Sequence, residues 1–149
     1  MIYLAGPCDS EHRTIMAQIA KFLREEGAEI FCPWEYKVEN AWDIPQEEWA
    51  KKVFDKDVAA ITASEALIII SVGRTSSAGT NWEQGFAYAK NIPTHVIQIT
   101  DEPTSLMTYC GSTSFINVPR YHGNLKGELR WILRNPHEEN HNKCETVLT

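Results

Sequence analysis

Residues 66–90 read ALIIISVGRTSSAGTNWEQGFAYAK and predict a strand, a tight loop and a helix. The apolar run 66–72 forms the strand, and the helical pattern begins at Thr80 with Glu83 in its first turn. In an open α/β sheet, ligands bind in the crevice beyond the carboxyl ends of the strands. We therefore expect a chemical site at this corner, formed by Ser76, Ser77, Gly79, Thr80 and Glu83.

Glu83 has two interpretations within this stretch. Residues 80–83 fit a capping box, in which the Thr80 hydroxyl caps the helix and the Glu83 side chain returns to the Thr80 amide. The helix dipole would also favour an ionised carboxylate, so Glu83 suits a nucleophile that is charged at neutral pH and needs no separate base. The stretch alone leaves both interpretations open.

Size and charge narrow the classes of function. The chain has 149 residues, 43% of them hydrophobic, which suffices for one domain whose core needs neither disulfides nor metal. A net charge of −6 and the lack of a basic run argue against a nucleic-acid polymer as partner, although a few local donors could still bind a small anion. No segment approaches the length of a membrane span, and Met1 leads directly into strand-like sequence, so we expect a cytoplasmic protein without a membrane partner.

The cysteines carry no recognisable motif. They are scattered without a C-x-x-C pair, at Cys8, Cys32, Cys110 and Cys144. This pattern predicts reduced thiols rather than a zinc or redox site. Cys8 falls in the loop after the first strand, but no histidine is near it in the sequence, which makes it a weak candidate for a nucleophile.

The first 32 residues predict a strand, a helix and a second strand. Residues 2–5 form an apolar strand, Gly6-Pro7 ends it, and Ser10 is placed to cap the helix that follows. Apolar residues recur at helical spacing, at Ile15, Ile19, Phe22 and Leu23. Gly27 is a natural helix stop before a strand at 28–32. The unit lacks both the G-x-G-x-x-G of dinucleotide folds and a Walker P-loop.

Residues 33–45 form a long connection that is too aromatic for a plain solvated loop. It carries Trp34, Tyr36 and Trp42. Long ordered loops are often lids or binding loops, and aromatic faces suit a planar ring such as a nucleobase. The equally weighted alternative is that these rings simply cover the sheet.

A helix is predicted at 46–63, with Asp57 on its apolar face. Trp49, Val53 and Ile61 recur along one stripe, and Asp57 lies between them. Asp55 points elsewhere and is expected to be solvated. A carboxylate on a core-facing stripe is costly unless it is paired or used, so Asp57 is a candidate functional residue, with the capping of a neighbouring loop as the alternative.

The remaining elements complete an α/β domain. We predict strands at 95–99 and 115–118 and a last helix at 125–133, separated by a loop that contains Ser105-Leu106-Met107. The fold expected is a single flavodoxin-like or Rossmann-like domain at 1–135, with a five-stranded parallel sheet and helices on both faces. Residues 136–149 are predicted to be a polar, flexible tail, and its His137 and His141 are not expected to bind metal.

Three segments resemble the nucleoside 2-deoxyribosyltransferase family. They are Ile2-Tyr3-Leu4-Ala5-Gly6-Pro7, Phe54-Asp55-Lys56-Asp57 and Gly79-Thr80-Asn81-Trp82-Glu83-Gln84-Gly85-Phe86-Ala87, and the third is the most specific. The resemblance extends over 2–118. It implies that Glu83 is the nucleophile that attacks the anomeric carbon, that Tyr3 orients Glu83, and that Asp57 lies near the leaving base.

The resemblance also implies a mechanism and partners. Glu83 would form a glycosyl ester through an oxocarbenium-like transition state, and Asp57 would protonate the departing base. The expected partners are a small nucleoside or nucleotide and a free nucleobase, with no metal and no organic cofactor. Ser105-Leu106-Met107 resembles the segment that, in family dimers, reaches into the neighbouring subunit's site, so a homodimer or higher even oligomer is expected.

Two positions depart from the transferase pattern. Ser77 stands where the transferases usually carry an aspartate for the sugar 5′-hydroxyl, and Ser105 stands where they carry asparagine. The related deoxynucleoside 5′-monophosphate N-glycosidases have serines at both positions, and hydroxyls can donate to a phosphate. Asp9 in the first loop would oppose a phosphate, whereas Arg13 and Arg74 could donate to one.

Several assignments therefore stay open at this level. The expected substrate-binding residues are Gly6, Ser10, Trp34, Ser77, Gly79, Ser105 and Met107. The function can be base exchange or strict hydrolysis of a monophosphate. A nucleotide-binding sensor without turnover and a flavin protein are the alternatives from other classes.

Overall fold

The structure is a computed structural model, and it describes residues 1–119 and 124–139. Its centre is a five-stranded parallel sheet in the order β2-β1-β3-β4-β5. The strands are β1 (Ile2–Ala5), β2 (Ile30–Phe31), β3 (Ala66–Ser71), β4 (Thr94–Gln98) and β5 (Ser114–Asn117). This is the flavodoxin-like order, so the predicted fold class is confirmed.

β3 occupies the middle of the sheet because it is apolar on both faces. All six of its residues are buried, and it pairs in parallel with β1 and β4. Successive side chains point to opposite faces, so Ile68 and Ile70 enter one core cluster and Leu67 and Ile69 enter the other. A strand that reads as a continuous apolar run is what a parallel sheet covered on both sides requires.

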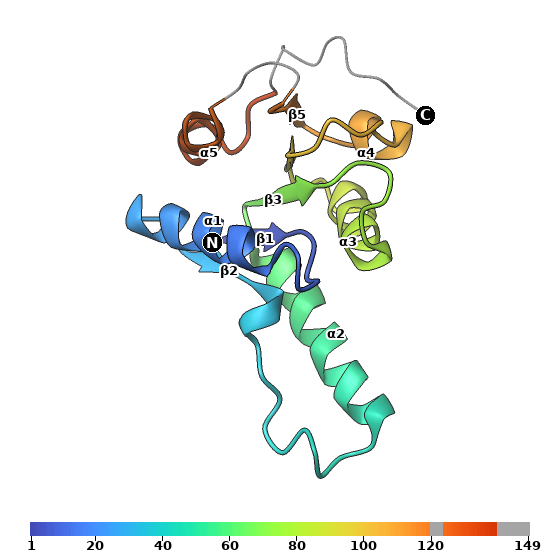
Figure 1. Ribbon diagram of the computed structural model, residues 1–149. Helices are drawn as coiled ribbons and strands as arrows, with labels where there is room; N and C mark the ends of the chain where they lie inside the picture. Colours follow the sequence, from blue (N-terminus) through green and yellow to red (C-terminus); the bar gives the residue numbers. More distant parts are fainter. Residues whose placement is uncertain (120–123, 140–149) are drawn as a thin grey trace.

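Helices cover both faces of the sheet (Figure 1). On one face, α1 (Arg13–Glu25) and α5 (Leu125–Arg134) pack their apolar residues against the strands. The other face is covered by α2 (Gln46–Ala63) and α3 (Ala78–Ala89), and α4 (Leu106–Cys110) lies beside α3. The predicted strands and helices are all present, with boundaries within two residues of those expected from the sequence, and the helix predicted to begin at Thr80 starts at Ala78. The segment predicted to be a loop around Leu106 instead forms α4.

The start of α1 differs from the prediction. The residue that precedes the helix is His12, and Ser10 does not cap it. Instead, the carboxylate of Asp9 accepts a hydrogen bond from the His12 amide at 3.0 Å and a second one from the His12 ring at 2.9 Å. The other end is as expected, because Gly27 adopts a φ of +93°, which a glycine tolerates at no steric cost.

The segment before α2 extends away from the sheet (Figure 1). It begins with the short 3₁₀ helix η1 (Pro33–Glu35), and together with the first turns of α2 it forms a projecting arm. Trp34 is partly buried against the core, so it does cover the sheet, whereas Trp42 is 99% exposed and does not. The interpretation that these rings cover the sheet is therefore confirmed for Trp34 and wrong for Trp42.

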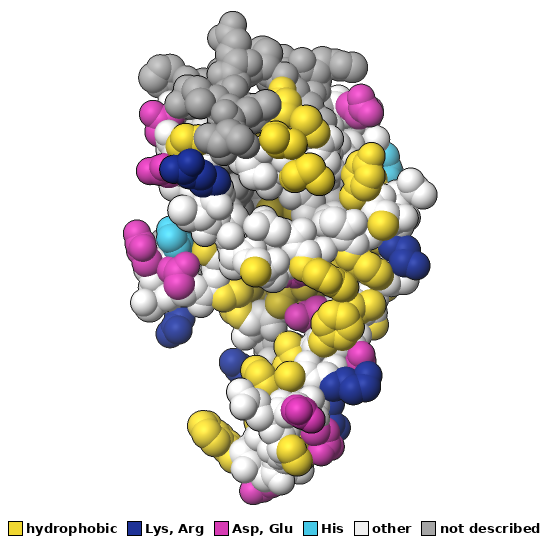
Figure 2. Space-filling view, turned by 90° about the vertical axis from the view of Figure 1, so that its right-hand side faces the viewer, with side chains coloured by type: hydrophobic (Ala, Val, Ile, Leu, Met, Phe, Trp, Pro, Cys, Tyr) yellow, Lys and Arg dark blue, Asp and Glu magenta, His cyan; other side chains and the backbone are white. Residues whose placement is uncertain are grey.

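Large apolar side chains are exposed on α2, α3 and α4. They are Trp49, Phe54, Trp82, Tyr88, Leu106 and Met107. Figure 2 views the molecule from the α3 side and shows hydrophobic side chains gathered above the projecting arm. Trp82 stacks on Phe86 with ring centroids 5.4 Å apart, and Phe54 contacts Trp82 edge to face with centroids 5.2 Å apart.

Pro136, which follows α5, contacts the sheet. The ring of His95 in β4 is wholly buried and lies 2.7 Å from the carbonyl oxygen of Pro136 and 2.6 Å from the Ser114 hydroxyl. A carbonyl only accepts, so the ring nitrogen facing Pro136 carries the proton. His141 lies outside the described residues.

Candidate active site

The candidate site lies where the strand order reverses. β1 and β3 are neighbours, and from them the chain continues to opposite sides of the sheet. The loops that follow these two strands flank a crevice at their carboxyl ends, the usual place for a ligand in this topology. One hydrogen bond joins the two sides, because the Thr80 hydroxyl donates to the Gly6 carbonyl at 3.3 Å.

Gly6 and Gly79 flank this crevice. A Cβ at Gly6 would lie 2.6 Å from the terminal carbon of Met16, so a side chain there would require Met16 to shift. A Cβ at Gly79 would lie 4.0 Å from a carboxylate oxygen of Glu83, which places the Glu83 carboxylate beside the first turn of α3. Both glycines predicted to bind substrate therefore lie beside the crevice at the carboxyl ends of β1 and β3.

α3 begins earlier than predicted, and this changes the interpretation of Glu83. Its N-cap is Ser77, whose hydroxyl oxygen accepts from the Thr80 amide at 3.2 Å and lies 2.8 Å from the Thr80 hydroxyl. Glu83 therefore lies in the second turn, beyond the reach of a capping box. Of the two interpretations of Glu83, the capping box is therefore wrong, and the Glu83 side chain is free for another use.

Tyr3 lies beneath Glu83. It is wholly buried on the α2 and α3 face of β1, and its ring stacks on Phe31 with centroids 5.4 Å apart. Burial and the negative charges of Glu83 and Asp57 raise the pKa of Tyr3, so its hydroxyl keeps its proton at neutral pH. The hydroxyl faces the Glu83 carboxylate without reaching regular hydrogen-bond geometry.

Asp57 approaches from α2. Its side chain is partly buried, and burial raises the pKa of this carboxyl, as its place on the apolar stripe led us to expect. Asp55, two residues earlier, is exposed and pairs with Lys51 at 2.9 Å. Of the two aspartates in this segment, Asp55 therefore forms a solvated ion pair, whereas the carboxyl group of Asp57 is partly buried.

Three buried polar atoms at this place have no hydrogen-bond partner among the described residues. They are the Tyr3 hydroxyl, one carboxyl oxygen of Asp57 and one of Glu83. They come from three elements, β1, α2 and α3, and the charge of Asp57 raises the pKa of both Tyr3 and Glu83. Burial without a partner is costly, and a fold retains such groups where a ligand supplies the missing partners.

The pKa of Glu83 departs from the expectation of a fully ionised carboxylate. Burial raises it, the Tyr3 hydroxyl lowers it and the negative charge of Asp57 raises it, and together they move the pKa from its ordinary 4.5 to about 7. Because Glu83 lies past the first turn, the helix dipole is weak at its position. Near neutral pH the group is divided between its protonated and ionised forms.

This pKa makes stability depend on pH. The folded state holds the Glu83 proton up to about pH 7, whereas the unfolded state releases it above 4.5, so stability falls as the pH rises through this window. Glu83→Gln removes the titration. We expect the free energy of unfolding of the wild type, relative to Glu83→Gln, to fall by roughly 3 kcal/mol between pH 4 and pH 8. Denaturant titrations at several pH values measure it, and a constant difference would contradict the assignment.

The other predicted binding residues lie at different places. Ser10 is exposed in the loop before α1. Ser105 precedes α4 and lines, with Met107, a cavity of about 390 Å³ between α3 and α4. Met107 is 74% exposed. Neither Ser105 nor Met107 shares this cavity with Tyr3, Asp57 or Glu83, so within one chain the two groups remain apart.

The sequence did not indicate the surroundings of two residues near the site, Cys8 and Lys37. Cys8 is close enough to Glu83 and Asp57 that their charges, together with burial, raise the pKa of its thiol, which disfavours the thiolate a nucleophile needs. Lys37 lines a cavity with Cys8 and Trp34, although 29 residues separate it from Cys8 in the sequence. No local pattern could have indicated this juxtaposition.

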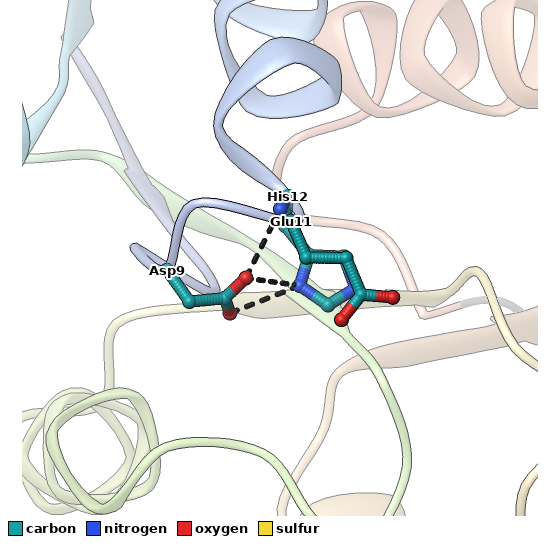
Figure 3. A group of neighbouring side chains, drawn as sticks. All are labelled: Asp9, Glu11 and His12. Atoms are coloured by element: carbon teal, nitrogen blue, oxygen red, sulfur yellow. Dashed lines mark hydrogen bonds and ion pairs between the residues drawn. The ribbon is translucent and has the colours of Figure 1, made fainter.

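Within 1–119 and 124–139, one group of side chains has the spacing of a metal site. The ligand atoms of Asp9, Glu11 and His12 lie within 4.8 Å of one another at the surface. Figure 3 shows the Asp9 carboxylate directed at the His12 ring, with which it forms hydrogen bonds. These bonds lower the pKa of Asp9 and account for the cluster without an ion.

No helix in the described part of the chain is long and apolar enough to cross a membrane.

Comparison with known proteins relates the whole domain to one group. A sequence model described as nucleoside 2-deoxyribosyltransferase matches residues 2–129. A solved 2-deoxyribosyltransferase from Bacillus psychrosaccharolyticus is similar with a TM-score of 0.68 at 24% identity, over 85% of this chain and 94% of that chain. No protein with a curated description matches the chain.

Two further solved structures share the fold. A conserved protein from Enterococcus faecalis V583 has a TM-score of 0.59 at 20% identity, over 99% of this chain and 80% of that chain. A CMP N-glycosidase from Clostridium botulinum has a TM-score of 0.52 at 18% identity, over 89% of this chain and 98% of that chain.

Proposed function

Because the chain belongs to the nucleoside 2-deoxyribosyltransferase family, we propose that it cleaves the N-glycosidic bond of a (2′-deoxy)nucleoside or its 5′-monophosphate. The sugar passes to another base or to water. The observation that carries this proposal is the convergence of unpartnered buried oxygens from Tyr3, Asp57 and Glu83. A glycoside positioned between the two carboxyl groups would use all three.

In the first step, an ionised Glu83 oxygen forms a bond to C1′ of the sugar while the bond from C1′ to the base nitrogen breaks. The electron pair of that bond leaves with the base. Asp57 in its protonated form donates its proton to the base as the base departs, and the burial that raises the pKa of this carboxyl supports the role. The product is a glycosyl ester of Glu83 and a neutral base.

In the second step, an acceptor base or a water molecule attacks C1′ and the ester bond breaks. The Asp57 carboxylate takes the proton from the attacking nitrogen or oxygen, and Glu83 leaves as a carboxylate. The Tyr3 hydroxyl, which faces Glu83 and stays protonated, stabilises this carboxylate by donating to it. Both side chains therefore return to their starting protonation states.

The pH dependence of turnover follows from the pKa of Glu83. Only ionised Glu83 attacks C1′, so kcat/KM for a neutral nucleoside should fall about tenfold per pH unit below about pH 7. Steady-state rates between pH 5 and pH 8 measure this limb. Because Asp57 and Glu83 interact, the profile reports the pair. A rate independent of pH across this range would show that Glu83 is not the titrating nucleophile.

Transfer and hydrolysis are distinguished by product analysis. Deoxynucleosides and their 5′-monophosphates are each incubated with and without a second free base, and the products are separated by chromatography. An exchanged nucleoside that forms only with the second base establishes a transferase. Free base and deoxyribose 5-phosphate from monophosphates alone establish a hydrolase. If neither product forms, the proposed function is wrong.

The substrate site is proposed to be completed by a second copy of the chain. Ser105 and Met107 lie outside the cluster of Tyr3, Asp57 and Glu83, and Met107 and Leu106 expose apolar surface. We expect a homodimer or higher even oligomer in which this segment enters the neighbouring site. A monomer with full activity at assay concentration, measured by light scattering, would contradict this arrangement.

A further inference from the structure

A second cavity, of about 380 Å³, lies between the loop after β1 and the connection from β2 to α2. Its lining consists of Pro7, Cys8, Arg13, Met16, Trp34 and Lys37. The wall is rigid on one side, because Met16 is buried and Trp34 packs against the core. A cavity of this size accommodates a phosphate, a nucleobase or part of a small ligand.

The wall of this cavity is positively charged, whereas the chain as a whole is negatively charged. Two of its lining residues, Arg13 and Lys37, are cationic and none is acidic, whereas the chain carries a net charge of −6. Neither cation has an ion pair or a side-chain hydrogen bond within the described residues. Arg24 and Arg130, by contrast, are paired with Glu35 and Glu26. Two unpaired cations on one concave wall attract an anion.

The cavity adjoins the candidate active site through the loop after β1. The Gly6 carbonyl accepts a hydrogen bond from the Thr80 hydroxyl in the first turn of α3, and the two residues after Gly6, Pro7 and Cys8, are part of the cavity wall. Asp9 is the nearby acidic group, and its carboxylate is directed at His12 rather than lining the cavity. A substrate that reacts at Glu83 can therefore extend into the cavity.

We propose that this cavity binds an anionic group of the substrate, a phosphate or a carboxylate, through Arg13 and Lys37. The proposal rests on the proposed function and names its substrate class. The anion can be a 5′-phosphate or an acidic substituent of the nucleobase, for which Trp34 offers an aromatic surface. Ser77 is less suited to this role, because its hydroxyl already caps α3.

The test compares three substrates with a common base, namely 2′-deoxyuridine, its 5′-monophosphate and 5-carboxy-2′-deoxyuridine. We expect the wild type to prefer one anionic substrate over the neutral one by at least about tenfold in kcat/KM. Arg13→Gln and Lys37→Gln should each lower that ratio roughly tenfold, mainly through KM. Lys52→Gln removes an exposed, unpaired cation of α2 outside the cavity and should leave the ratio unaltered. The preferred substrate identifies the source of the anion.

A binding measurement separates this proposal from the proposed function. Calorimetry measures the binding of 2-deoxyribose 5-phosphate against 2-deoxyribose, and of orotate against uracil. Binding of an anion that depends on Arg13 and Lys37, without turnover that depends on Glu83, would support the cavity and overturn the glycosidic reaction. Turnover that depends on Glu83 with no preference for either anion, or an equal loss in Lys52→Gln, would overturn the cavity and leave the reaction intact.

Discussion

Glu83→Gln is expected to lower kcat by at least about a thousandfold, because an amide oxygen cannot form the glycosyl ester. Glutamine has nearly the shape of glutamate and removes a buried, partly ionised group, so the variant should fold. Single-turnover rates with a (2′-deoxy)nucleoside measure the loss. Substrate binding should change far less than turnover, since the sugar and base contacts remain.

Glu128→Gln provides the matched control. Glu128 is also a partly buried glutamate whose pKa burial raises, but it lies in α5 on the opposite face of the sheet. Its replacement should leave turnover within about twofold of the wild type. If Glu83→Gln retained wild-type turnover, the nucleophile assignment would be wrong. If the wild type bound nucleotides without any turnover, the molecule would be a sensor.

Asp57→Asn is expected to lower kcat by roughly a hundredfold to ten thousandfold for natural nucleosides, because the departing base would lose its proton donor. The loss should depend on the leaving group. A glycoside whose leaving group is stable as an anion, such as p-nitrophenolate, needs little protonation, and the variant should process it at a rate close to that of the wild type. This dependence distinguishes a general acid from a residue that only supports the fold.

Asp55→Asn is the control for this experiment. Asp55 lies two residues earlier on the same helix, and its carboxylate forms an exposed ion pair with Lys51. Exposed pairs of this kind contribute little to stability, so the variant should match the wild type in both rate and fold. An equal loss for good and poor leaving groups in Asp57→Asn would exclude proton donation by Asp57.

The position of the candidate site was predictable because two signals agreed. The apolar run that forms β3 and the small residues after it predicted a strand followed by a loop at the sheet edge. The family resemblance then selected Glu83, Asp57 and Tyr3 from several polar residues. The structure brings these three together, and their catalytic roles remain proposals that the variants above test.

The local sequence pattern predicted the wrong capping residue at the start of α3. Residues 80–83 satisfy the capping-box pattern, yet Ser77 caps the helix and Thr80 is buried. Thr80 instead donates to the Gly6 carbonyl, a contact between residues 74 positions apart. Sequence spacing carries no information about such a partner, so the more distant contact could not be anticipated.

The sequence by itself determined the elements, the parallel sheet and the burial of β3, because apolar periodicity and helix stops act over a few neighbouring residues. Only the tertiary structure decided the environment of each functional group. Three features arise where separate elements meet. They are the raised pKa of Glu83, the three unpartnered oxygens, and the presence of Arg13 and Lys37 in the wall of one cavity. Burial and electrostatic interaction depend on distances in space, which the order of residues along the chain does not specify.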